Sequence, residues 1–221
     1  MALRYPQASI HQLRREGSLT QEQAEAGRAL AAEKGFALWV AWGTFFRGWA
    51  LAERSPVPGA GQGQREEGIA QMQQGLVAWR ATGAETLRPY FLALLAEASA
   101  KVGQVEEGLT LLAEALAVTN EKGERRWEAE LYRLQGELLL ARDTGQDTEA
   151  ETCFRQALDI ARRQQAKSWE LRAAMSLGRL WQQQGKWTEA HELLGPIYGW
   201  FTEGFDTADL QEATALLEEL S

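Results

Sequence analysis

The chain contains the phrase Gly63-Gln-Arg-Glu-Glu-Gly68 and three variants of it, and this repetition decides the fold. The variants are Gly103-Gln-Val-Glu-Glu-Gly108, Gly145-Gln-Asp-Thr-Glu-Ala150 and Gly185-Lys-Trp-Thr-Glu-Ala190. Their leading glycines lie 40, 42 and 40 residues apart. A fixed period in this range is typical of arrays of helix pairs, in which each repeat buries its apolar side against its neighbours. The phrase therefore predicts a helical repeat protein.

Each part of the phrase predicts a structural role. The leading glycine is expected to end one helix, because glycine adopts the left-handed conformation that follows a helix without steric cost. The next helix is expected to open two or three residues later with acidic residues in its first turn, such as Glu106 and Glu107. Carboxylates suit the positive end of the helix dipole. We therefore interpret the acidic pairs as helix-start signals.

The spacing after the phrase is helical. A small residue is followed by a bulky one four positions later and by a small or apolar one seven positions later, as in Ala150, Phe154 and Ala157. This pattern places all three on one face of an α-helix. A second small residue follows 28 positions after the small residue that ends each of the first three phrases. It is Gly136 after Gly108 and Gly178 after Ala150. We expect these two glycines at tight contacts between antiparallel helices.

Two elements of the sequence resemble the tetratricopeptide repeat (TPR). One is Ala150 followed four positions later by Phe154, and the other is Gly178 followed three positions later by Trp181. Further strings resemble the C-terminal repeat region of large bacterial signalling proteins, which carry a class III nucleotidyl cyclase domain, then an AAA-type ATPase domain, then such repeats. The strings are Arg47-Gly-Trp-Ala-Leu51, Arg88-Pro-Tyr-Phe-Leu92, Glu130-Leu-Tyr-Arg-Leu-Gln-Gly136 and Gly199-Trp-Phe-Thr-Glu-Gly-Phe-Asp206.

The resemblance covers essentially the whole chain and implies nothing catalytic, because the cyclase and ATPase motifs belong to parts that are absent here. With the period, it predicts an all-α, right-handed α-solenoid of about five TPR-like helix pairs plus a C-terminal capping helix, as a single domain over 1–221. A mobile loop is expected at 55–64. The predicted segments are a partial first repeat at 1–35, repeats at 36–83, 84–123, 124–166 and 167–205, and a capping helix at 206–221.

Composition disfavours several kinds of partner. The 23 basic and 31 acidic residues give a net charge of −8, and nucleic acids and anionic membranes both favour a basic surface. Cys153 is the only cysteine, so an internal disulfide is impossible. The first residues lack an apolar signal core, and no stretch approaches the roughly 18 apolar residues that span a bilayer. We expect a cytoplasmic protein without nucleic-acid or membrane partners.

The sequence offers no pattern typical of an enzyme. Its two histidines, His11 and His191, stand in different repeats and belong to no spacing that holds a metal. There is no Gly-x-Ser-x-Gly motif of the kind that presents a nucleophilic serine. We therefore expect no enzymatic activity, no cofactor and no metal.

A concave groove is then the place where function is expected. In helix-pair repeats of this family the first helix of each repeat lines the concave side, and residues pointing away from the small packing position would face it. These candidates are Trp42, Phe45, Phe46, Trp49, Tyr90, Glu97, Lys101, Arg133, Glu137, Arg172, Met175, Arg179 and Gln183. Two interpretations stay open: the aromatic residues line the groove or pack in the core, and the charged residues bind a partner or are merely solvated.

Three functional hypotheses follow from this pattern. The first is a protein-interaction module that binds a peptide, a protein or another domain of its own parent protein. The second is a domain that senses a small ligand and controls an attached ATPase or cyclase. The third is a structural solenoid that associates with itself, for example as a homodimer. For the first hypothesis we expect Trp42, Phe46 and Trp49, which share a helix face, to be partly exposed to solvent.

Overall fold

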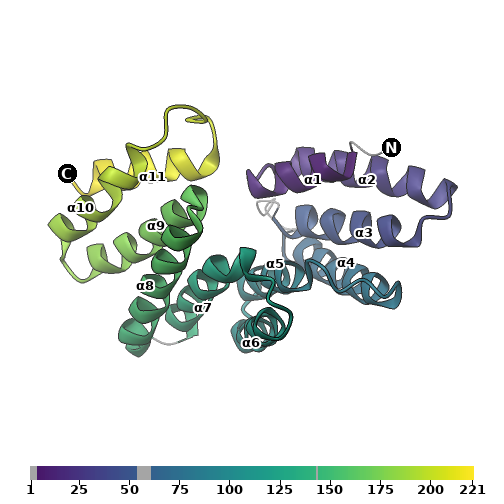
Figure 1. Ribbon diagram of the computed structural model, residues 1–221, viewed down its shortest axis with the longest axis horizontal. Helices are drawn as coiled ribbons and strands as arrows, with labels where there is room; N and C mark the ends of the chain where they lie inside the picture. The colour runs from purple at the N-terminus through teal and green to yellow at the C-terminus, as the bar shows by residue number, and fades with distance from the viewer. Residues whose placement is uncertain (1–3, 54–60, 143) are drawn as a thin grey trace. The chain divides into compact units, whose positions relative to one another are not determined.

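A computed structural model describes residues 4–53, 61–142 and 144–221, and the described residues form α-helices joined by short turns, with no strand (Figure 1). The predicted all-α class is confirmed. Two short 3-10 turns, Arg125–Trp127 and Thr144–Gln146, precede α7 and α8. The helices are α1 (Arg4–Leu13), α2 (Gly17–Glu33), α3 (Ala37–Ala52), α4 (Gly61–Ala81), α5 (Arg88–Lys101), α6 (Val105–Lys122), α7 (Glu128–Arg142), α8 (Asp147–Gln164), α9 (Lys167–Gln183), α10 (Trp187–Tyr198) and α11 (Ala208–Glu219).

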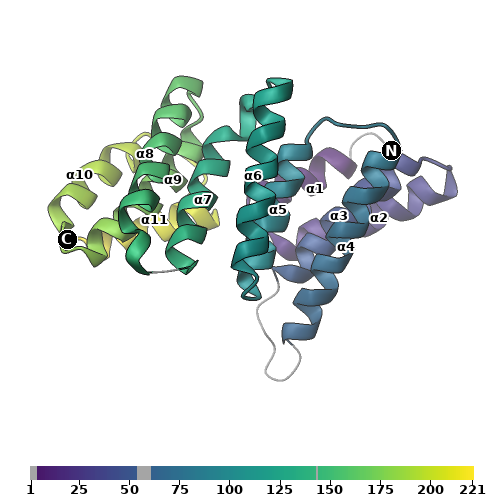
Figure 2. The ribbon, with the colours of Figure 1, turned by 90° about the horizontal axis from the view of Figure 1, so that it is seen from below.

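The chain divides into two compact units, Met1–Leu111 and Leu112–Ser221, here called the N-terminal and C-terminal units. In the N-terminal unit α3 contacts α1, α2, α4 and α5. In the C-terminal unit α9 contacts α7, α8, α10 and α11 (Figure 2). Each unit thus has one helix that touches most of the others. The single domain over 1–221 and its repeat bounds stay predictions.

The glycines of the repeated phrase end helices at two of the four expected positions. Gly103 and Gly185 have φ values of +85° and +77°, the left-handed conformation that closes a helix. Gly63 instead lies inside α4, which begins at Gly61, and Gly145 lies in a 3-10 turn. The prediction is wrong at these two positions. Of the loop expected at 55–64, residues 55–60 lie outside the described part of the chain, and residues 61–64 belong to α4.

Helices α3 and α4 meet backbone to backbone through glycines. A Cβ atom added to Gly48 would lie 2.5 Å from the carbonyl oxygen of Gly68, and one added to Gly68 would lie 2.6 Å from that of Gly48. A Cβ at Gly75 would lie 2.7 Å from the backbone nitrogen of Phe45. Only residues without a side chain allow this approach. The predicted packing role of small residues is thus confirmed for this pair.

In the C-terminal unit the two predicted glycine contacts differ. A Cβ at Gly136 would lie 2.5 Å from the Phe154 ring, so this position is as tight as expected. A Cβ at Gly178 would lie 3.6 Å from Leu216 and 4.0 Å from Ala190, which is ordinary van der Waals contact. The expectation of a tight contact at Gly178 is therefore wrong. The reason is that its neighbours are a flexible leucine and a small alanine.

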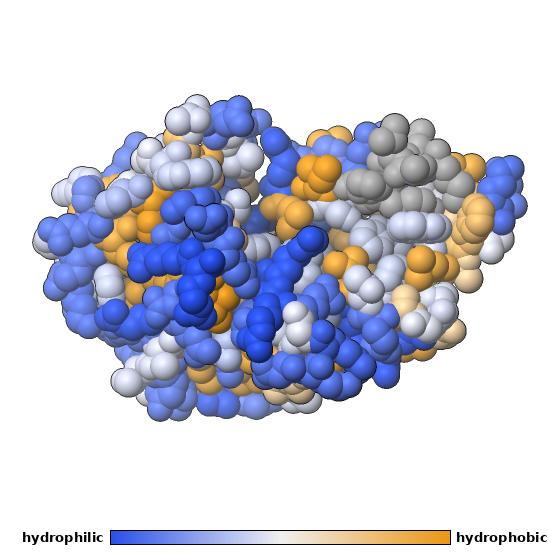
Figure 3. Space-filling view, in the orientation of Figure 1, coloured by the Kyte–Doolittle hydropathy of each residue, from blue (hydrophilic) through white to orange (hydrophobic). Residues whose placement is uncertain are grey.

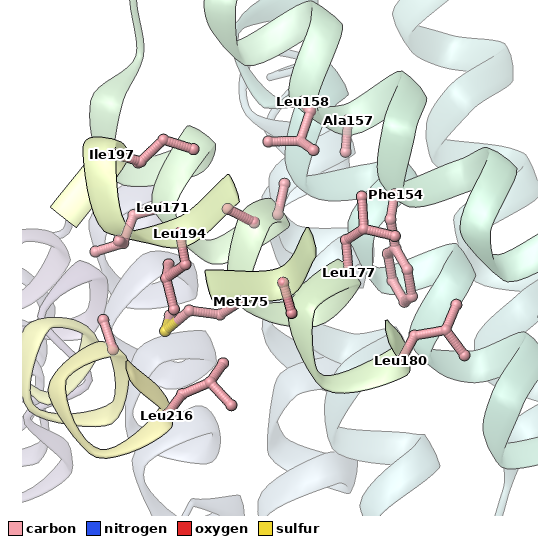
Figure 4. Packing of buried hydrophobic residues seen from close by; sticks show 14 of the residues in the cluster. Phe154, Ala157, Leu158, Leu171, Met175, Leu177, Leu180, Leu194, Ile197 and Leu216 are labelled. Carbon is pink, nitrogen blue, oxygen red and sulfur yellow. The ribbon is translucent and has the colours of Figure 1, made fainter. Parts of the chain in front are cut away.

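The apolar core of the C-terminal unit includes the last helix. Met175 on α9, Leu194 on α10 and Leu216 on α11 converge in Figure 4 and are almost fully buried. Leu210 and Ala213 complete the buried side of α11, and Leu220, directly after its end, is buried too. The expected capping helix therefore contributes to the core and does not merely cover it.

We predict opposite effects of alanine at two helical glycines. Gly48→Ala should lower the free energy of unfolding by about 1–3 kcal/mol, because its methyl group would collide with the α4 backbone. Gly178→Ala should be neutral or should raise it by about 0.5–1 kcal/mol, because alanine is the better helix former and the space exists. Urea denaturation measures both. Equal destabilisation by the two substitutions would contradict the packing described here.

Candidate partner-binding surfaces

Four of the five aromatic side chains of α3 form a core and not a groove. Phe45 and Phe46 have no exposed surface, and Trp42 and Trp49 are 8% and 2% exposed. Phe45 stacks on Phe91 of α5 with ring centroids 4.3 Å apart. The expectation that Trp42, Phe46 and Trp49 are partly exposed is wrong. The physical reason is that α1, α2, α4 and α5 all contact α3.

The groove residues expected on α5 are bound within the N-terminal unit. Tyr90 is buried, and its hydroxyl donates to Oε1 of Gln12 on α1. Lys101 binds Glu53, beyond the end of α3, and Glu97, whose Oε1 lies 3.1 Å from Nζ. Burial acts to lower the pKa of Lys101, but the two carboxylates outweigh it and the pKa is raised. These side chains hold α5 in place.

In the C-terminal unit the structure brings predicted groove residues together on one surface. Arg133 and Glu137 lie on α7, and Arg172 and Arg179 lie on α9. Ion pairs and hydrogen bonds connect them to side chains that the sequence did not single out. We call this surface the polar face, and it consists of Glu130, Arg133, Glu137, Arg172, Ser176, Arg179, Asp209 and Glu212.

Arg133 connects α7 to α9 on the polar face. Its Nε and Nη2 atoms donate to the two carboxylate oxygens of Glu130 at 2.7 and 2.8 Å. Its Nη1 atom lies 3.3 Å from Oε1 of Glu137, and this oxygen also accepts a 2.6 Å hydrogen bond from Oγ of Ser176. A bidentate arginine–carboxylate pair is strong and fixes the geometry of both side chains. The centre of the polar face is therefore ordered before any partner arrives.

Two arginines of α9 attach α11 to the polar face. Nε of Arg172 donates to Oδ2 of Asp209 at 2.7 Å, and Nη2 of Arg179 donates to Oε2 of Glu212 at 3.1 Å. Nη1 of Arg172 also lies 3.6 Å from Oε1 of Glu130. Arg172 thus links three helices, α7, α9 and α11.

The polar face has a buried base and an accessible rim. The side chains of Arg133 and Arg172 are each 13% exposed. Those of Glu137, Arg179 and Glu212 are 40%, 43% and 37% exposed. The interpretation of the charges as merely solvated is wrong for the two central arginines. The rim residues can meet a partner.

In this unit sequence reasoning placed one residue wrongly and missed four. Met175 was expected in the groove but is 2% exposed and belongs to the core, whereas Gln183 is exposed at the end of α9. On α7 the missed residue is Glu130, and its spacing to Arg133 is a visible helical signal. Ser176, Asp209 and Glu212 carry no such signal, because their role depends on how α9 packs against α7 and α11.

A hollow of about 500 Å³ opens in the N-terminal unit, at the end of α2, the start of α3 and the end of α4. Its lining is mostly small and apolar. The hydroxyls of Thr44 and Thr82 donate to nearby backbone carbonyls, those of Val40 and Trp79, at 2.8 and 2.7 Å. The lining residues are Ala32, Gly35, Ala37, Val40, Ala41, Thr44, Gln74, Ala78, Ala81 and Thr82.

Within the described ranges, no group of three or more His, Cys, Asp and Glu side chains is arranged to hold a metal ion. Burial raises the pKa of the Cys153 thiol, which disfavours the reactive thiolate. No helix in the described part of the chain is both long and apolar enough to cross a bilayer.

Comparison with solved structures identifies the fold. A kinesin light chain-like protein from Podosopora anserina, described as having nearly identical TPR-like repeats, superposes with a TM-score of 0.53 at 20% identity over 98% of this chain and 94% of that one. A variant of the same protein with one substitution gives 0.55 at 21% identity over 89% and 92%. The fold is TPR-like. At this level of identity the likeness concerns the fold alone.

Comparison of sequences says less. No protein-family profile matches the chain. An uncharacterized protein of Rhizobium meliloti (strain 1021) is 30% identical over 135 residues, which is 61% of this chain. The match spans 12% of the length of that relative. The TPR-like part of the sequence resemblance is confirmed, whereas the connection to cyclase and ATPase signalling proteins stays a prediction.

We predict that Phe46→Ala lowers the free energy of unfolding by roughly 3–5 kcal/mol, because it leaves a cavity in a fully buried aromatic cluster. The matched control is Phe205→Ala, since this phenylalanine is 48% exposed and should contribute less than about 1 kcal/mol. Guanidinium denaturation measures both. A loss of under about 1 kcal/mol at Phe46 would mean that α3 does not form the core.

Proposed function

We propose that this chain is a non-catalytic protein-interaction module that binds a peptide or protein on the polar face of the C-terminal unit. The observation that carries the proposal is the ordered row of charges across α7, α9 and α11. Its rim residues Glu137, Arg179 and Glu212 stay accessible. TPR-like folds with stacked helices provide extended surfaces of the kind that accept protein partners.

The geometry favours binding in two ways. First, the central arginines are already held by carboxylates, so little side-chain entropy is lost when a partner meets them. Second, rim charges of both signs reward a partner with the complementary arrangement and penalise others. Arginine is also enriched at protein interfaces. The buried α3 residues Trp42, Phe45, Phe46 and Trp49 have no place in this surface.

A peptide selection tests this function while the partner is still unidentified. Peptides from a random displayed library would be selected on the immobilised chain, and the affinity of each selected peptide for the chain would be measured. Arg179→Glu, on the rim of the polar face, should weaken binding at least about tenfold, the loss expected when an interface charge is reversed. The matched control is Arg155→Glu, because Arg155 is 58% exposed and pairs with Glu151 within α8.

The outcome decides between surfaces. Selected peptides whose affinity falls in Arg179→Glu and not in Arg155→Glu support binding at the polar face. Selected peptides whose affinity changes in neither variant, or a selection that yields no peptides, would overturn this proposal.

The hollow in the N-terminal unit favours a second candidate function, the sensing of a small ligand. Its volume of about 500 Å³ lies within the range of small-molecule sites, roughly 300–1,000 Å³. The lining of alanines with Thr44, Gln74 and Thr82 at hand suits a largely apolar molecule with one polar group. Such a ligand would contact three helices and stabilise the unit.

Filling the hollow tests this candidate. A library of small apolar compounds would be screened by thermal shift, and hits should bind the wild-type chain. Ala78→Trp should abolish the shift, because Ala78 lines the hollow. Val77→Trp is the control, since Val77 is 68% exposed and does not line it. Equal effects of the two tryptophans would reject a ligand site there.

We also propose that the chain is the repeat region of a longer bacterial signalling protein, so that its partner can be another domain of that protein. The resemblance carried by strings such as Gly199–Asp206 supports this, and so does a match that spans 12% of a longer relative. The sequence that flanks the coding region tests it. Flanking domains unrelated to cyclases or ATPases would contradict the proposal.

A further inference from the structure

The loop between α10 and α11 (Figure 1) contains large aromatic residues whose side chains are exposed to solvent. Trp200 is 58% exposed and Phe205 is 48% exposed. Aromatic residues are enriched where proteins bind partners, so two exposed rings in one ordered loop make it a candidate contact surface. We call residues 199–207 the aromatic corner.

The aromatic corner is ordered, so its exposed rings hold defined positions. Thr207 donates to the Gly204 carbonyl from its backbone nitrogen at 2.9 Å and from its hydroxyl at 2.7 Å. The Phe205 ring packs on Tyr198 with centroids 6.0 Å apart. The Trp200 ring meets Phe201 edge-on at 5.2 Å. A partner would therefore meet preorganised rings and would freeze few of them on binding.

One of these rings already binds a cation within the chain. Nζ of Lys167, the first residue of α9, lies 5.7 Å from the centroid of the Trp200 ring. The same Nζ lies 2.7 Å from Oε2 of the buried Glu170. A tryptophan face attracts ammonium and guanidinium groups through its quadrupole. The contact shows which side-chain chemistry the corner accepts, namely a cation placed between an aromatic face and a carboxylate.

The charge of the chain is concentrated around this corner. Residues 187–221 contain eight acidic residues and no Lys or Arg, whereas residues 1–186 contain 23 of each sign. The excess of acidic over basic residues therefore lies in the sequence of α10, the corner and α11, although Asp209 and Glu212 are paired with Arg172 and Arg179 of α9. Two of the acids, Glu203 and Asp206, lie in the corner itself and are exposed. Figure 3 shows hydrophobic residues among strongly hydrophilic ones on the surface of this unit.

We propose that the aromatic corner docks a segment of a protein partner that is rich in Lys and Arg. The exposed rings offer cation–π and apolar contact, and the surrounding carboxylates complement the positive charge of the segment. The corner adjoins the polar face, because Asp209 at the start of α11 binds Arg172. The proposal rests on the proposed function in that both assign the partner to the C-terminal unit. It adds the chemical class of the segment that is recognised.

The test uses three fluorescein-labelled peptides of equal length in which Gly alternates with Lys and Arg, with Gln, or with Glu. Fluorescence anisotropy measures their affinity for the whole chain. The variants are Trp200→Ala and Glu203→Gln, both at exposed side chains. The matched control is Trp187→Ala, since Trp187 is 47% exposed and lies at the opposite end of α10, about 18 Å away by helix rise.

The basic peptide should bind, and the Gln and Glu peptides should bind at least about tenfold more weakly. Trp200→Ala should cost about tenfold, as truncation of an interface hot spot does, whereas Trp187→Ala should change the affinity by less than about twofold. Glu203→Gln should weaken binding and flatten its dependence on salt, because it removes one attractive charge.

Three results would overturn the proposal. Equal binding of all three peptides would mean that the corner does not recognise positive charge. Equal losses of affinity for the basic peptide in Trp187→Ala and Trp200→Ala would mean that the peptide is attracted diffusely to an acidic surface and does not dock at the corner. If the basic peptide fails but library peptides respond to Arg179→Glu, only this proposal falls and the proposed function stands.

Discussion

The direct contact between the backbones of α3 and α4 is the constraint on which the N-terminal unit depends. Gly48 and Gly68 leave no room for even a methyl group between the helices, and Gly75 does the same beside Phe45. Because α4 lies so close on one side, and α1, α2 and α5 also contact α3, its side chains Trp42, Phe45, Phe46 and Trp49 are left almost no contact with solvent. The aromatic residues of α3 are therefore forced into contact with one another and with Phe91.

The same constraint explains why the sequence predicted the positions of the helices better than the burial of their side chains. A period near 40 and glycine-led turns predict where most helices begin and end, because both signals are local. A helix that is apolar nearly all round, such as α3, gives the same pattern whether it is enclosed or borders a groove. The burial of α3 depends on glycines of α4 that lie about 20 to 30 residues further along the chain. A single sequence does not show which side of α3 these glycines will contact. Gly136 and Gly178 illustrate the limit, since equal spacing led to one tight site and one loose one.

The polar face shows a similar division. The spacing of Glu130, Arg133 and Glu137 along α7 is a helical pattern that the sequence contains in full. The contribution of α11 is not contained there, because Asp209 and Glu212 gain their partners only when the buried leucines of α11 settle on α9. Ion pairs then fix an alignment that apolar packing alone would leave less specific. The last helix thus completes both the core and the charged surface of its unit.

In the docking that we propose, the acidic residues and the exposed aromatic rings of the last 35 residues act at different stages of binding. Long-range attraction acts before contact, so the acidic residues around α10 and α11 govern how often an oppositely charged molecule arrives, and dissolved ions reduce that frequency. Short-range contact acts after arrival, so rings such as Trp200 and Phe205 govern how long it stays. Encounter frequency and residence time can therefore change independently through substitutions a few residues apart. Such substitutions would turn short-lived binding into long-lived binding without altering the apolar core.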